Sequence, residues 1–475
     1  MMAIQPVLLW SDLCIWLLVL AAVGAAWWSS RQPPLRAAWS RVARNRVGMA
    51  SATLLAVFVL IGLADSLHYR PQLPPKSGDD PAKPVYAIEV LSALDALLMP
   101  LRTKVEKTYS EPLATRAYAK EMIEIREADG TVRKAREYPR LRHGGTHLAA
   151  DEARAVSDIA LRCALALAVG AVLWTALALL FAWRVARGRG IAIAIAWRQI
   201  WRHQEGPAWN AVLLTLAAVI ALAALIAGPA GAYHVFGTDK VGQDVLYQVL
   251  KSIRTALVIG LVTTLVTLPL AVVLGIVAGY FRGWVDDLIQ YLYTTLNSIP
   301  GVLLIAAAVL MMQVLIDTHP QWFSTAAERA DLRLLALCFI LGLTSWTGLA
   351  RLLRGEVLKL RELEYVQAAQ AFGVSDLRII ARHLLPNLMH IVIIALVMDF
   401  SGLVLAEAVL SYVGIGVDPT MISFGTMINN ARMELGREPV VWWSLVAAFA
   451  FMFAMVLAAN LLADAVRDAF DPRMA

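Results

Sequence analysis

The sequence predicts an all-α polytopic membrane protein with about nine transmembrane helices. Of its 475 residues, 59% are hydrophobic and only 16% are charged, a balance that is rare in soluble domains. The apolar residues come in blocks long enough to cross a bilayer. Arginines gather in short loops between these blocks, and such loops typically stay in the cytoplasm.

The first segment, residues 1–67, holds two predicted spans at about 7–28 and 47–67. The first span has no basic leader and no small-residue cleavage site, so we expect a retained helix and not a signal peptide. The loop between the spans has no acidic residue and carries Arg31, Arg36, Arg41, Arg44 and Arg46. Its arginines predict that the loop lies in the cytoplasm and that the N-terminus lies in the periplasm.

Residues 68–157 are polar and form a predicted periplasmic insertion. We expect helices over 88–105 and 110–126, and the Asp-Gly pair within 128–131 predicts a turn between short extended pieces. His143 and His147 lie four residues apart, with two glycines between them. The glycines argue against a helix that would bring the two imidazoles together, and no third ligand is apparent, so we do not expect a metal site.

Residues 158–236 contain two additional spans, at about 159–183 and 209–227. The basic loop between them, again predicted to be cytoplasmic, carries Arg184, Arg187, Arg189, Arg198 and Arg202. The three cysteines of the chain all fall in or beside apolar spans: Cys14, Cys163 and Cys338. We therefore expect small buried residues, and neither a disulfide framework nor a zinc site.

The stretch from Gly237 to Asp244 has two glycines at the spacing of a phosphate-binding loop. The Lys and Ser/Thr that such a loop requires are replaced by Gln243 and Asp244, and no buried strand precedes the glycines. We therefore do not expect this chain to hydrolyse ATP. The local pattern predicts a turn followed by an amphipathic helix.

Five more spans are predicted at about 255–280, 288–315, 334–353, 386–412 and 442–462. Pro269 lies inside the first of these spans and can kink it, while Gly275 and Gly279 allow a neighbouring helix to come close. Pro300 lies inside the second.

Two carboxylates, Asp399 and Glu407, fall within the span at 386–412. A charge at membrane depth is costly and normally faces a cavity or a partner. Eight residues leave the two side chains roughly 80° apart around a helix, so one cavity could take both. Both are candidates for a translocation pathway, together with Pro300, although structural hydrogen bonding is an equal alternative for Glu407.

The stretch from 346 to 387 lies between two spans, yet it is polar and rich in helix formers. We expect a helix through Ala371 and a break at Gly373, which can adopt the left-handed conformation that ends helices. A second short helix is expected from about Asp376, with Ser375 as its N-cap. From local physics alone, an ordinary loop with two surface helices explains the stretch as well as a docking elbow does.

Within this stretch, small and apolar residues follow a spaced pattern. The pattern begins with Glu-Ala-Ala and, after a gap of three residues, has a Gly. After about nine more residues it has an apolar residue, then one residue of any type, and it ends with Leu-Pro. Residues that fit the pattern are Gln367, Ala368, Ala369, Gly373, Leu385 and Pro386. The stretch thus resembles the "EAA" coupling loop of permease subunits of ATP-binding cassette (ABC) importers. It departs at Gln367, where the family usually has Glu, and at His383, where an apolar residue is usual. The departure at Gln367 bears on a charged contact with the ATPase but not on the docking shape.

Further resemblances to the dipeptide/oligopeptide permease family follow in order over residues 237–475. Three segments resemble quoted family motifs: 237–246 resembles "GTDxxGRDV", 279–286 resembles "GYFGGWVD", and 405–414 resembles "LAEAxLSFLG". Three more segments resemble the family without a short motif: the residues around Pro300, the loop 414–434 and the tail 463–473. Two basic lead-ins, Trp39-x-x-Val42-x-Arg44 and Trp197-x-x-Ile200-x-Arg202, both resemble the approach to the family's first helix. Either span, 47–67 or 209–227, could therefore be that helix.

The resemblance implies a type I ABC importer permease core at 237–475, preceded by extra helices and the periplasmic insertion. It implies that the coupling loop, 356–387, contacts an ATPase through Glu364, Gln367, Ala368, Ala369, Gly373, Leu385 and Pro386. It also implies a multi-pass inner-membrane protein with a cytoplasmic C-terminus that imports peptides or related small solutes. Nickel, opine, glutathione and peptide-antibiotic uptake stay open as alternatives.

The implied partners are a second homologous permease, two ATPase subunits that hold ATP and Mg²⁺, a periplasmic substrate-binding protein and membrane lipid, but no nucleic acid. This chain itself is expected to have no catalytic residue, metal or cofactor. A membrane enzyme is disfavoured because the sequence has no Gly-x-Ser-x-Gly, no His-Glu-x-x-His and no histidine in the middle of a span. A membrane sensor or assembly protein that acts through residues 68–157 is the alternative function.

Overall fold

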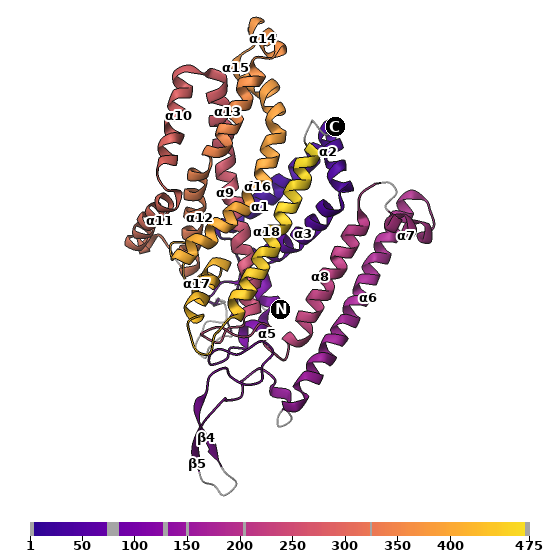
Figure 1. Ribbon diagram of the computed structural model, residues 1–475, viewed down its shortest axis with the longest axis vertical. Helices are drawn as coiled ribbons and strands as arrows, with labels where there is room; N and C mark the ends of the chain where they lie inside the picture. Colours follow the sequence, from indigo (N-terminus) through magenta and orange to yellow (C-terminus); the bar gives the residue numbers. More distant parts are fainter. Residues whose placement is uncertain are drawn as a thin grey trace. The chain divides into compact units, whose positions relative to one another are not determined.

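The computed structural model describes residues 4–73, 85–126, 132–148, 152–202, 206–323 and 325–470. These residues are mostly helical (Figure 1). Nine helical segments among them are long and apolar enough to cross a membrane, and each overlaps one predicted span. The predicted all-α polytopic fold class is therefore confirmed.

The helices and strands run in the following order. The helices are α1 (Trp10–Arg31), α2 (Pro33–Arg44), α3 (Arg46–Asp65), α4 (Ala93–Leu97), α5 (Met99–Thr103), α6 (Ala155–Arg189), α7 (Ile193–Arg202), α8 (Trp209–Ala230), α9 (Val245–Phe281), α10 (Gly283–Ser298), α11 (Gly301–Thr318), α12 (Ala326–Ser345), α13 (Thr347–Arg361), α14 (Glu364–Ala371), α15 (Asp376–Ile379), α16 (Leu385–Val413), α17 (Phe424–Glu434) and α18 (Trp443–Phe470). The strands are β1 (Ile4–Val7), β2 (His68–Pro71), β3 (Leu91–Ser92), β4 (Glu121–Arg126) and β5 (Val132–Glu137). Strands β1, β2 and β3 form one small sheet, and β4 and β5 form a hairpin.

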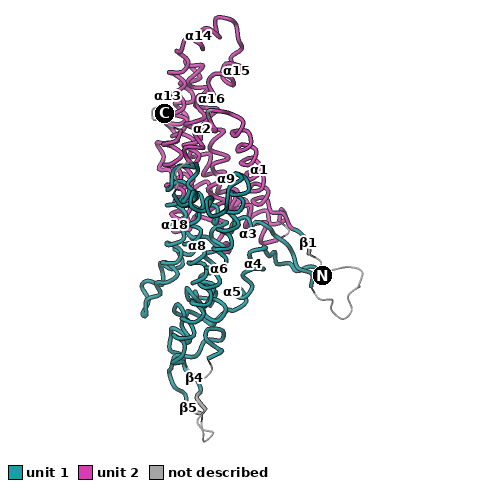
Figure 2. The backbone as a smooth tube through the Cα atoms, turned by 90° about the vertical axis from the view of Figure 1, so that its right-hand side faces the viewer, with its two compact units in different colours: residues 1–6, 43–254, 422–458 teal, residues 7–42, 255–421, 459–475 magenta. Residues whose placement is uncertain are grey.

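The chain divides into two compact units (Figure 2). Unit 1 comprises residues 1–6, 43–254 and 422–458, and unit 2 comprises residues 7–42, 255–421 and 459–475. Helices α9 and α18 each supply residues to both units, so these units cut across the predicted core at 237–475.

In unit 1, the long helix α6 packs closely along α8. Small residues make this possible: a side chain added at Gly170 would press on Ala224 and Ile220, and one at Gly228 would lie 2.8 Å from the Arg162 carbonyl oxygen. Small residues at a helix interface let backbones approach closely within a membrane. The two additional spans therefore form a tight helical hairpin.

The polar segment before α6 is less helical than the sequence predicts. The helix expected over 88–105 is reduced to α4 and α5. The helix expected over 110–126 is wrong, because residues 121–126 pair with residues 132–137 in an antiparallel hairpin. Polar helix-forming residues favoured a helix locally, but the ladder hydrogen bonds to β5 satisfy the backbone instead. The extended pieces around the predicted turn are present, while the turn at 128–131 lies outside the described residues.

The insertion is joined to the segment that precedes α9 by backbone pairing. Thr238 donates its backbone N–H to the Ser110 carbonyl, at 3.1 Å, and Glu106 donates to the Gly242 carbonyl, at 2.9 Å. Gly237 and Gly242 both have positive φ, and a Cβ at Gly242 would lie 1.9 Å from the Glu106 carbonyl oxygen. The two glycines with phosphate-loop spacing thus allow the insertion's backbone to approach.

A buried cluster of charged residues reinforces this junction. The imidazole of His234 lies between the carboxylates of Asp244, at 2.7 Å, and Glu106, at 3.4 Å. Glu106 also accepts backbone N–H bonds from residues 142–144. All three side chains are almost completely buried, so the insertion is an integral part of unit 1.

In unit 2, α9 packs against α13 through two glycines, as the sequence predicts. A Cβ added at Gly275 would lie 2.8 Å from the Ala350 carbonyl oxygen, and one at Gly279 would lie 2.8 Å from Cβ of Val357. The two glycines are four residues apart and share a helix face. They set a close crossing of α9 and α13 at the end of unit 2 that carries α14.

The single span expected at 288–315 is instead two helices, α10 and α11. Ile299 is extended, with φ −94° and ψ 130°, and Pro300 stands at the start of α11. The residue before a proline is disfavoured from the helical region, and Pro itself lacks an N–H. Pro300 therefore divides this segment, which the sequence predicts to be one span.

Candidate functional site

The polar stretch between α13 and α16 folds into an elbow, which we define as residues 362–386. Figures 1 and 2 show α14 and α15 at one end of unit 2. The helix expected to continue through Ala371 is interrupted, because α13 ends at Arg361 and α14 begins at Glu364. Leu363, at the break, is extended with ψ 140°.

Gly373 ends α14 in the left-handed conformation that the sequence predicts. Its φ is +72°, and no atom outside its immediate neighbours would lie within 4 Å of an added Cβ. The Val374 N–H bonds to the Ala369 carbonyl at 3.1 Å, and the Gly373 N–H bonds to the Gln370 carbonyl at 3.0 Å. These two bonds form a Schellman cap, so glycine is needed here for its backbone conformation and not for space.

The second arm of the elbow differs from the expected short helix capped by Ser375. Ser375 occupies the N-cap position, but its side chain makes no capping hydrogen bond. Its backbone carbonyl accepts from Arg378 and Ile379 instead. Helix α15 then continues through a π-helical turn at Ile380–Leu384 into α16, which gives one helical segment from Asp376 to Val413.

The π-helical turn explains how this segment can contain a proline near its bend. The Leu385 N–H bonds to the Ile380 carbonyl, five residues back. Pro386 follows immediately, in the first turn of α16, and has no N–H to donate. A single wide turn of this kind changes the register of backbone bonds without ending the helix.

Tyr280, at the end of α9, connects both arms of the elbow to the helix bundle. Its hydroxyl donates to Asp376 of α15 at 2.7 Å and accepts from the Gln370 amide of α14 at 3.2 Å. The Arg361 guanidinium, at the end of α13, donates to the Tyr280 carbonyl at 2.5 Å. A movement of either arm therefore acts directly on α9.

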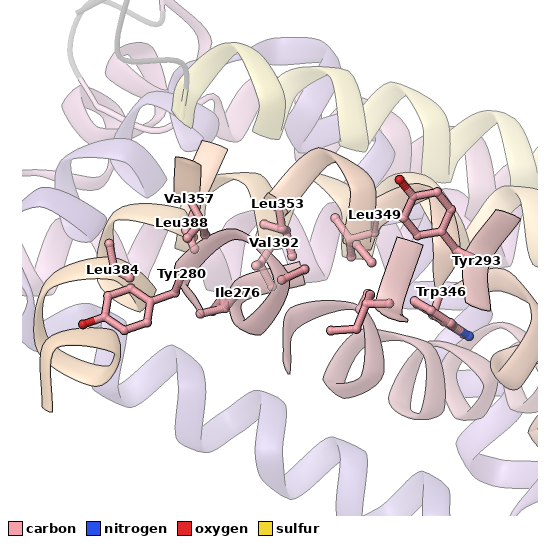
Figure 3. Packing of buried hydrophobic residues seen from close by; sticks show 14 of the residues in the cluster. Ile276, Tyr280, Tyr293, Trp346, Leu349, Leu353, Val357, Leu384, Leu388 and Val392 are labelled. Atoms are coloured by element: carbon pink, nitrogen blue, oxygen red, sulfur yellow. The ribbon is translucent and has the colours of Figure 1, made fainter. Parts of the chain in front are cut away.

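The elbow is anchored by buried apolar side chains. Val366, Ile379 and Leu384 are fully buried and join a cluster that follows α9, α13 and α16. Figure 3 shows this cluster as a row of side chains, with Leu384 and Tyr280 near one end and Trp346 and Tyr293 near the other. The elbow is thus the end of a continuous core and not a loose loop.

Two large apolar side chains on the outer surface of the elbow are not covered by any of the residues that the structure describes. Phe372 is 88% exposed and Leu377 is 79% exposed, on either side of Gly373. Ala368 and Ala371 are also exposed, so the backbone between them is accessible. Large apolar side chains held out on a rigid support are typical of an interaction surface.

Among the predicted coupling residues, those at the surface are Glu364, Gln367, Ala368, Gly373 and Pro386, while Ala369 and Leu385 are half-buried. The fold brings all seven together in the elbow. The Gln367 amide donates to the backbone carbonyl of Glu362 at 3.3 Å, so it faces the break after α13. Their role in coupling stays a prediction.

The three pathway candidates lie away from the elbow. Glu407 is only 1% exposed and accepts a hydrogen bond of 2.7 Å from Ser411, one turn further along α16. Asp399 is half-buried and makes no hydrogen bond or ion pair with the residues that the structure describes. Pro300 is exposed at the start of α11. Whether any of them lines a pathway stays a prediction.

Comparisons with known proteins place this geometry in a family. Residues 271–475 match the family model of the binding-protein-dependent transport system inner membrane component. The oligopeptide transport system permease protein OppC of Mycobacterium tuberculosis is 30% identical over 244 residues, which cover 51% of this chain and 77% of the relative. This chain belongs to that family.

Two further relatives agree. The glutathione transport system permease protein GsiD of Escherichia coli is 32% identical over 241 residues, or 51% of this chain and 73% of the relative. The dipeptide transport system permease protein DppC of Bacillus subtilis is 28% identical over 246 residues, or 52% and 71%. The chain is therefore a multi-pass inner-membrane permease subunit of an ABC importer.

Several residues in the permease elbow, or in contact with it, were not identified from the sequence. Tyr280 and Asp376 are 96 residues apart, and Phe372 and Leu377 look like ordinary apolar residues in an amphipathic stretch. Arg282 is a further case: it has a positive φ of 56° and pairs with Glu362 at 2.5 Å. Its signal was present, because Arg282 stands where the family pattern "GYFGGWVD" has glycine.

The histidines of the permease's insertion have partners other than a metal. The backbone N–H of His143 bonds to Glu106, and the His147 ring contacts Asp158 at 2.8 Å. Within the described ranges, no group of three or more His, Cys, Asp or Glu side chains could hold a metal ion. Of the cysteines, Cys338 is buried while Cys14 and Cys163 are partly exposed.

Proposed function

We propose that this permease imports peptides or small peptide-like solutes such as glutathione, driven by ATP hydrolysis in partner ATPase subunits. The relatives named for oligopeptide, dipeptide and glutathione transport support this substrate class. The proposed assembly contains a second homologous permease, two ATPases that bind ATP and Mg²⁺, and a periplasmic substrate-binding protein.

The proposed orientation puts the N-terminus in the periplasm and the elbow and the C-terminus in the cytoplasm. The Arg-rich loops after α1 and after α6 support it, because such loops stay on the cytoplasmic side. Nine spans then return the C-terminus to that side. The elbow is separated from each Arg-rich loop by an even number of spans, so an ATPase in the cytoplasm could reach it.

The observation that carries the coupling role is the combination of an exposed apolar tip with a buried, hydrogen-bonded base. Phe372 and Leu377 offer the ATPase an apolar contact, and burying each of these side chains against a partner contributes about 1.5–3 kcal/mol. Tyr280 and the buried Val366 transmit a displacement of that tip to α9 and α13. An ATPase shifts the permease between two states only if it binds them with different affinity, and the elbow is where that difference arises.

The conformation of Gly373 provides the test. Replacing Gly373 with Val puts a β-branched side chain at φ +72°, which costs about 1–2 kcal/mol or more and distorts the cap. We expect uptake per ATP hydrolysed to fall roughly tenfold, with membrane insertion unchanged, in proteoliposomes that contain the complete complex and the substrate-binding protein.

Gly355→Val is the matched control. Gly355 lies in α13, and an added Cβ there also meets nothing within 4 Å, but its φ is not positive. This control should keep uptake and ATP hydrolysis coupled. Uptake by Gly373→Val equal to that of the unmodified complex would refute the docking role of the elbow.

A further inference from the structure

We propose that unit 1 contains a binding site for one acyl chain of an anionic membrane phospholipid. The site is a cavity of about 520 Å³ bounded by α3, α4, α5, α8, the start of α9 and Phe451 of α18. This volume is within the usual range of small-molecule pockets. No residue of the comparison families' coupling loop takes part in it.

The lining of this cavity has the chemistry of a hydrocarbon site. Every lining residue is aliphatic, aromatic, proline or glycine, from Leu54 and Ile61 on α3 to Ala223 and Ala227 on α8. Water gains little in such a space, because it finds no hydrogen-bond partners there. An alkyl chain loses nothing on entering and fills the gap with dispersion contacts.

The position of the cavity indicates where the alkyl chain comes from. Both α3 and α8 are membrane-spanning segments by length and hydropathy. Two lining residues, Leu97 and Leu222, are 73% and 58% exposed, so the cavity is open to the surroundings of these helices. The medium around these helices is the bilayer itself, so the apolar molecules that can reach the opening at high concentration are lipids.

A cation at the mouth indicates an anionic headgroup. The Lys104 ammonium donates to the carbonyl of Gly231, a lining residue, and makes no ion pair among the described residues. Nearby Arg102, in contrast, already pairs with Glu89. Lys104 also lines a small pocket with His234 and Asp244, so its ammonium group lies between the buried charged cluster and the apolar cavity. An ammonium group beside an apolar cavity complements a phosphate attached to an acyl chain.

Two other occupants fit the cavity less well. A peptide substrate would bring backbone N–H and C=O groups into a lining that offers them no partner, at a cost of several kcal/mol. A transmembrane helix of a second subunit is about 10 Å wide and about 30 Å long across a bilayer, so it needs far more room than this cavity of about 520 Å³ offers. One alkyl chain satisfies both the shape and the polarity.

The first experiment uses the purified complex in vesicles of phosphatidylethanolamine and phosphatidylglycerol, with phosphatidylglycerol that carries a photoreactive diazirine on its acyl chain. We expect adducts on peptides from α3 and α8, measured by mass spectrometry. A double variant, Ala223→Phe with Ala227→Phe, fills the cavity and should lower these adducts about fivefold or more, because a packed site admits no further chain. Lys104→Gln should lower labelling by phosphatidylglycerol but not by phosphatidylethanolamine that carries the same diazirine.

Ala168→Phe is the matched control, since Ala168 is an exposed alanine of the spanning helix α6 that does not line the cavity. It should leave the adducts unchanged. The proposal is wrong if the double variant gives as many lipid adducts as the control. It is also wrong if the double variant no longer binds the second permease but still gives the lipid adducts.

A competition experiment on the unmodified protein gives a result even if the double variant does not fold. Excess unlabelled phosphatidylglycerol should suppress the α3 and α8 adducts more strongly than excess phosphatidylethanolamine, because a specific site saturates. Equal suppression by the two lipids would show that the adducts come from non-specific contact with the bilayer, and it would overturn the proposal.

Discussion

Arg282 holds a backbone conformation, φ 56° with ψ −167°, that is essentially confined to glycine. The strain costs on the order of 1–3 kcal/mol, while its exposed ion pair with Glu362 returns only about 0.2–1 kcal/mol. We therefore expect Arg282→Gly to raise the stability of the purified permease by about 1 kcal/mol, seen as a higher midpoint of thermal unfolding in detergent.

Arg282→Ala separates the two contributions, because it removes the ion pair but keeps the unfavourable backbone conformation. It should be less stable than Arg282→Gly by about 1–3 kcal/mol. Equal midpoints for the two variants would show that the turn is not strained.

The buried cluster of His234, Glu106 and Asp244 makes the junction of the insertion sensitive to pH. Burial alone would lower the pKa of His234, but its hydrogen bonds with Asp244 and then Glu106 outweigh burial and raise this pKa to about 9. Burial alone would raise the pKa of Glu106, but the His234 bond and three backbone N–H bonds lower it to about 2. The folded junction therefore holds a charged imidazole and a charged carboxylate at neutral pH.

These shifts define a pH window of maximal stability. The raised pKa of His234 adds stability that is complete below about 6.5 and is lost as pH rises to about 9. The lowered pKa of Glu106 adds stability that is complete above about 4.5 and is lost as pH falls to about 2. Hydrogen exchange of residues 104–113 should be slowest between about pH 4.5 and 6.5, after correction for intrinsic exchange rates. In His234→Gln the decline from pH 6.5 to 9 should disappear, and persistence of that decline would assign it to another group.

At the scale of elements, the crossing of α9 and α13 depends on the absence of side chains. A Cβ at Gly279 would lie 2.8 Å from Cβ of Val357 and 2.9 Å from the Arg354 carbonyl oxygen. We expect Gly279→Leu to force the two helices apart and to destabilise the permease by about 1–3 kcal/mol or more, measured by thermal unfolding. Gly24→Leu on α1 is the control, because an added Cβ there meets nothing within 4 Å. A similar loss of stability in both variants would indicate a defect in membrane insertion and not an effect on the crossing of α9 and α13.

The β4–β5 hairpin offers a sharper test of the sensor alternative than removal of the entire insertion. Deleting residues 68–157 would also remove Glu106 and uncover Gly237 and Gly242, so a permease would fail as well. The hairpin is different, because Ala117 and Pro139 at its base are already joined by a backbone bond of 2.8 Å. Replacing residues 119–138 with Gly-Gly should leave uptake within about twofold. Loss of uptake in a stably folded variant would favour the sensor function.

The sequence was informative where structure depends on local composition. Spans were located correctly because their apolar blocks are long, and the αL glycine at 373 follows from the end of a helical pattern. Prediction from the sequence failed where residues distant in the chain determine the structure. Strand β4 needs β5 for its hydrogen bonds, and the Tyr280–Asp376 bond joins positions that only the fold brings together. The break at Pro300 was not predicted, although the polar residues before it, from Thr294 to Ser298, interrupt the apolar block.

At the scale of the whole molecule, the family core is extended by a helical hairpin and an insertion that share unit 1 with the start of α9. The end of α3 is tied to that helix, since Lys251 pairs with Asp65 at 2.7 Å and Arg254 donates to Ser66 at 3.3 Å. We therefore favour α3 over α8 as the counterpart of the family's first helix.

Helix α15, the π-helical turn and α16 form one continuous helical segment. Its 38 residues rise by roughly 57 Å in total along the helix path, so they join the elbow to Val413 without an intervening loop. That far end carries Gly414 and Asp418, which line a small cavity with Arg333. If a partner ATPase displaces the elbow as proposed, this unbroken helix is the route by which the displacement would reach the cavity beside Asp418.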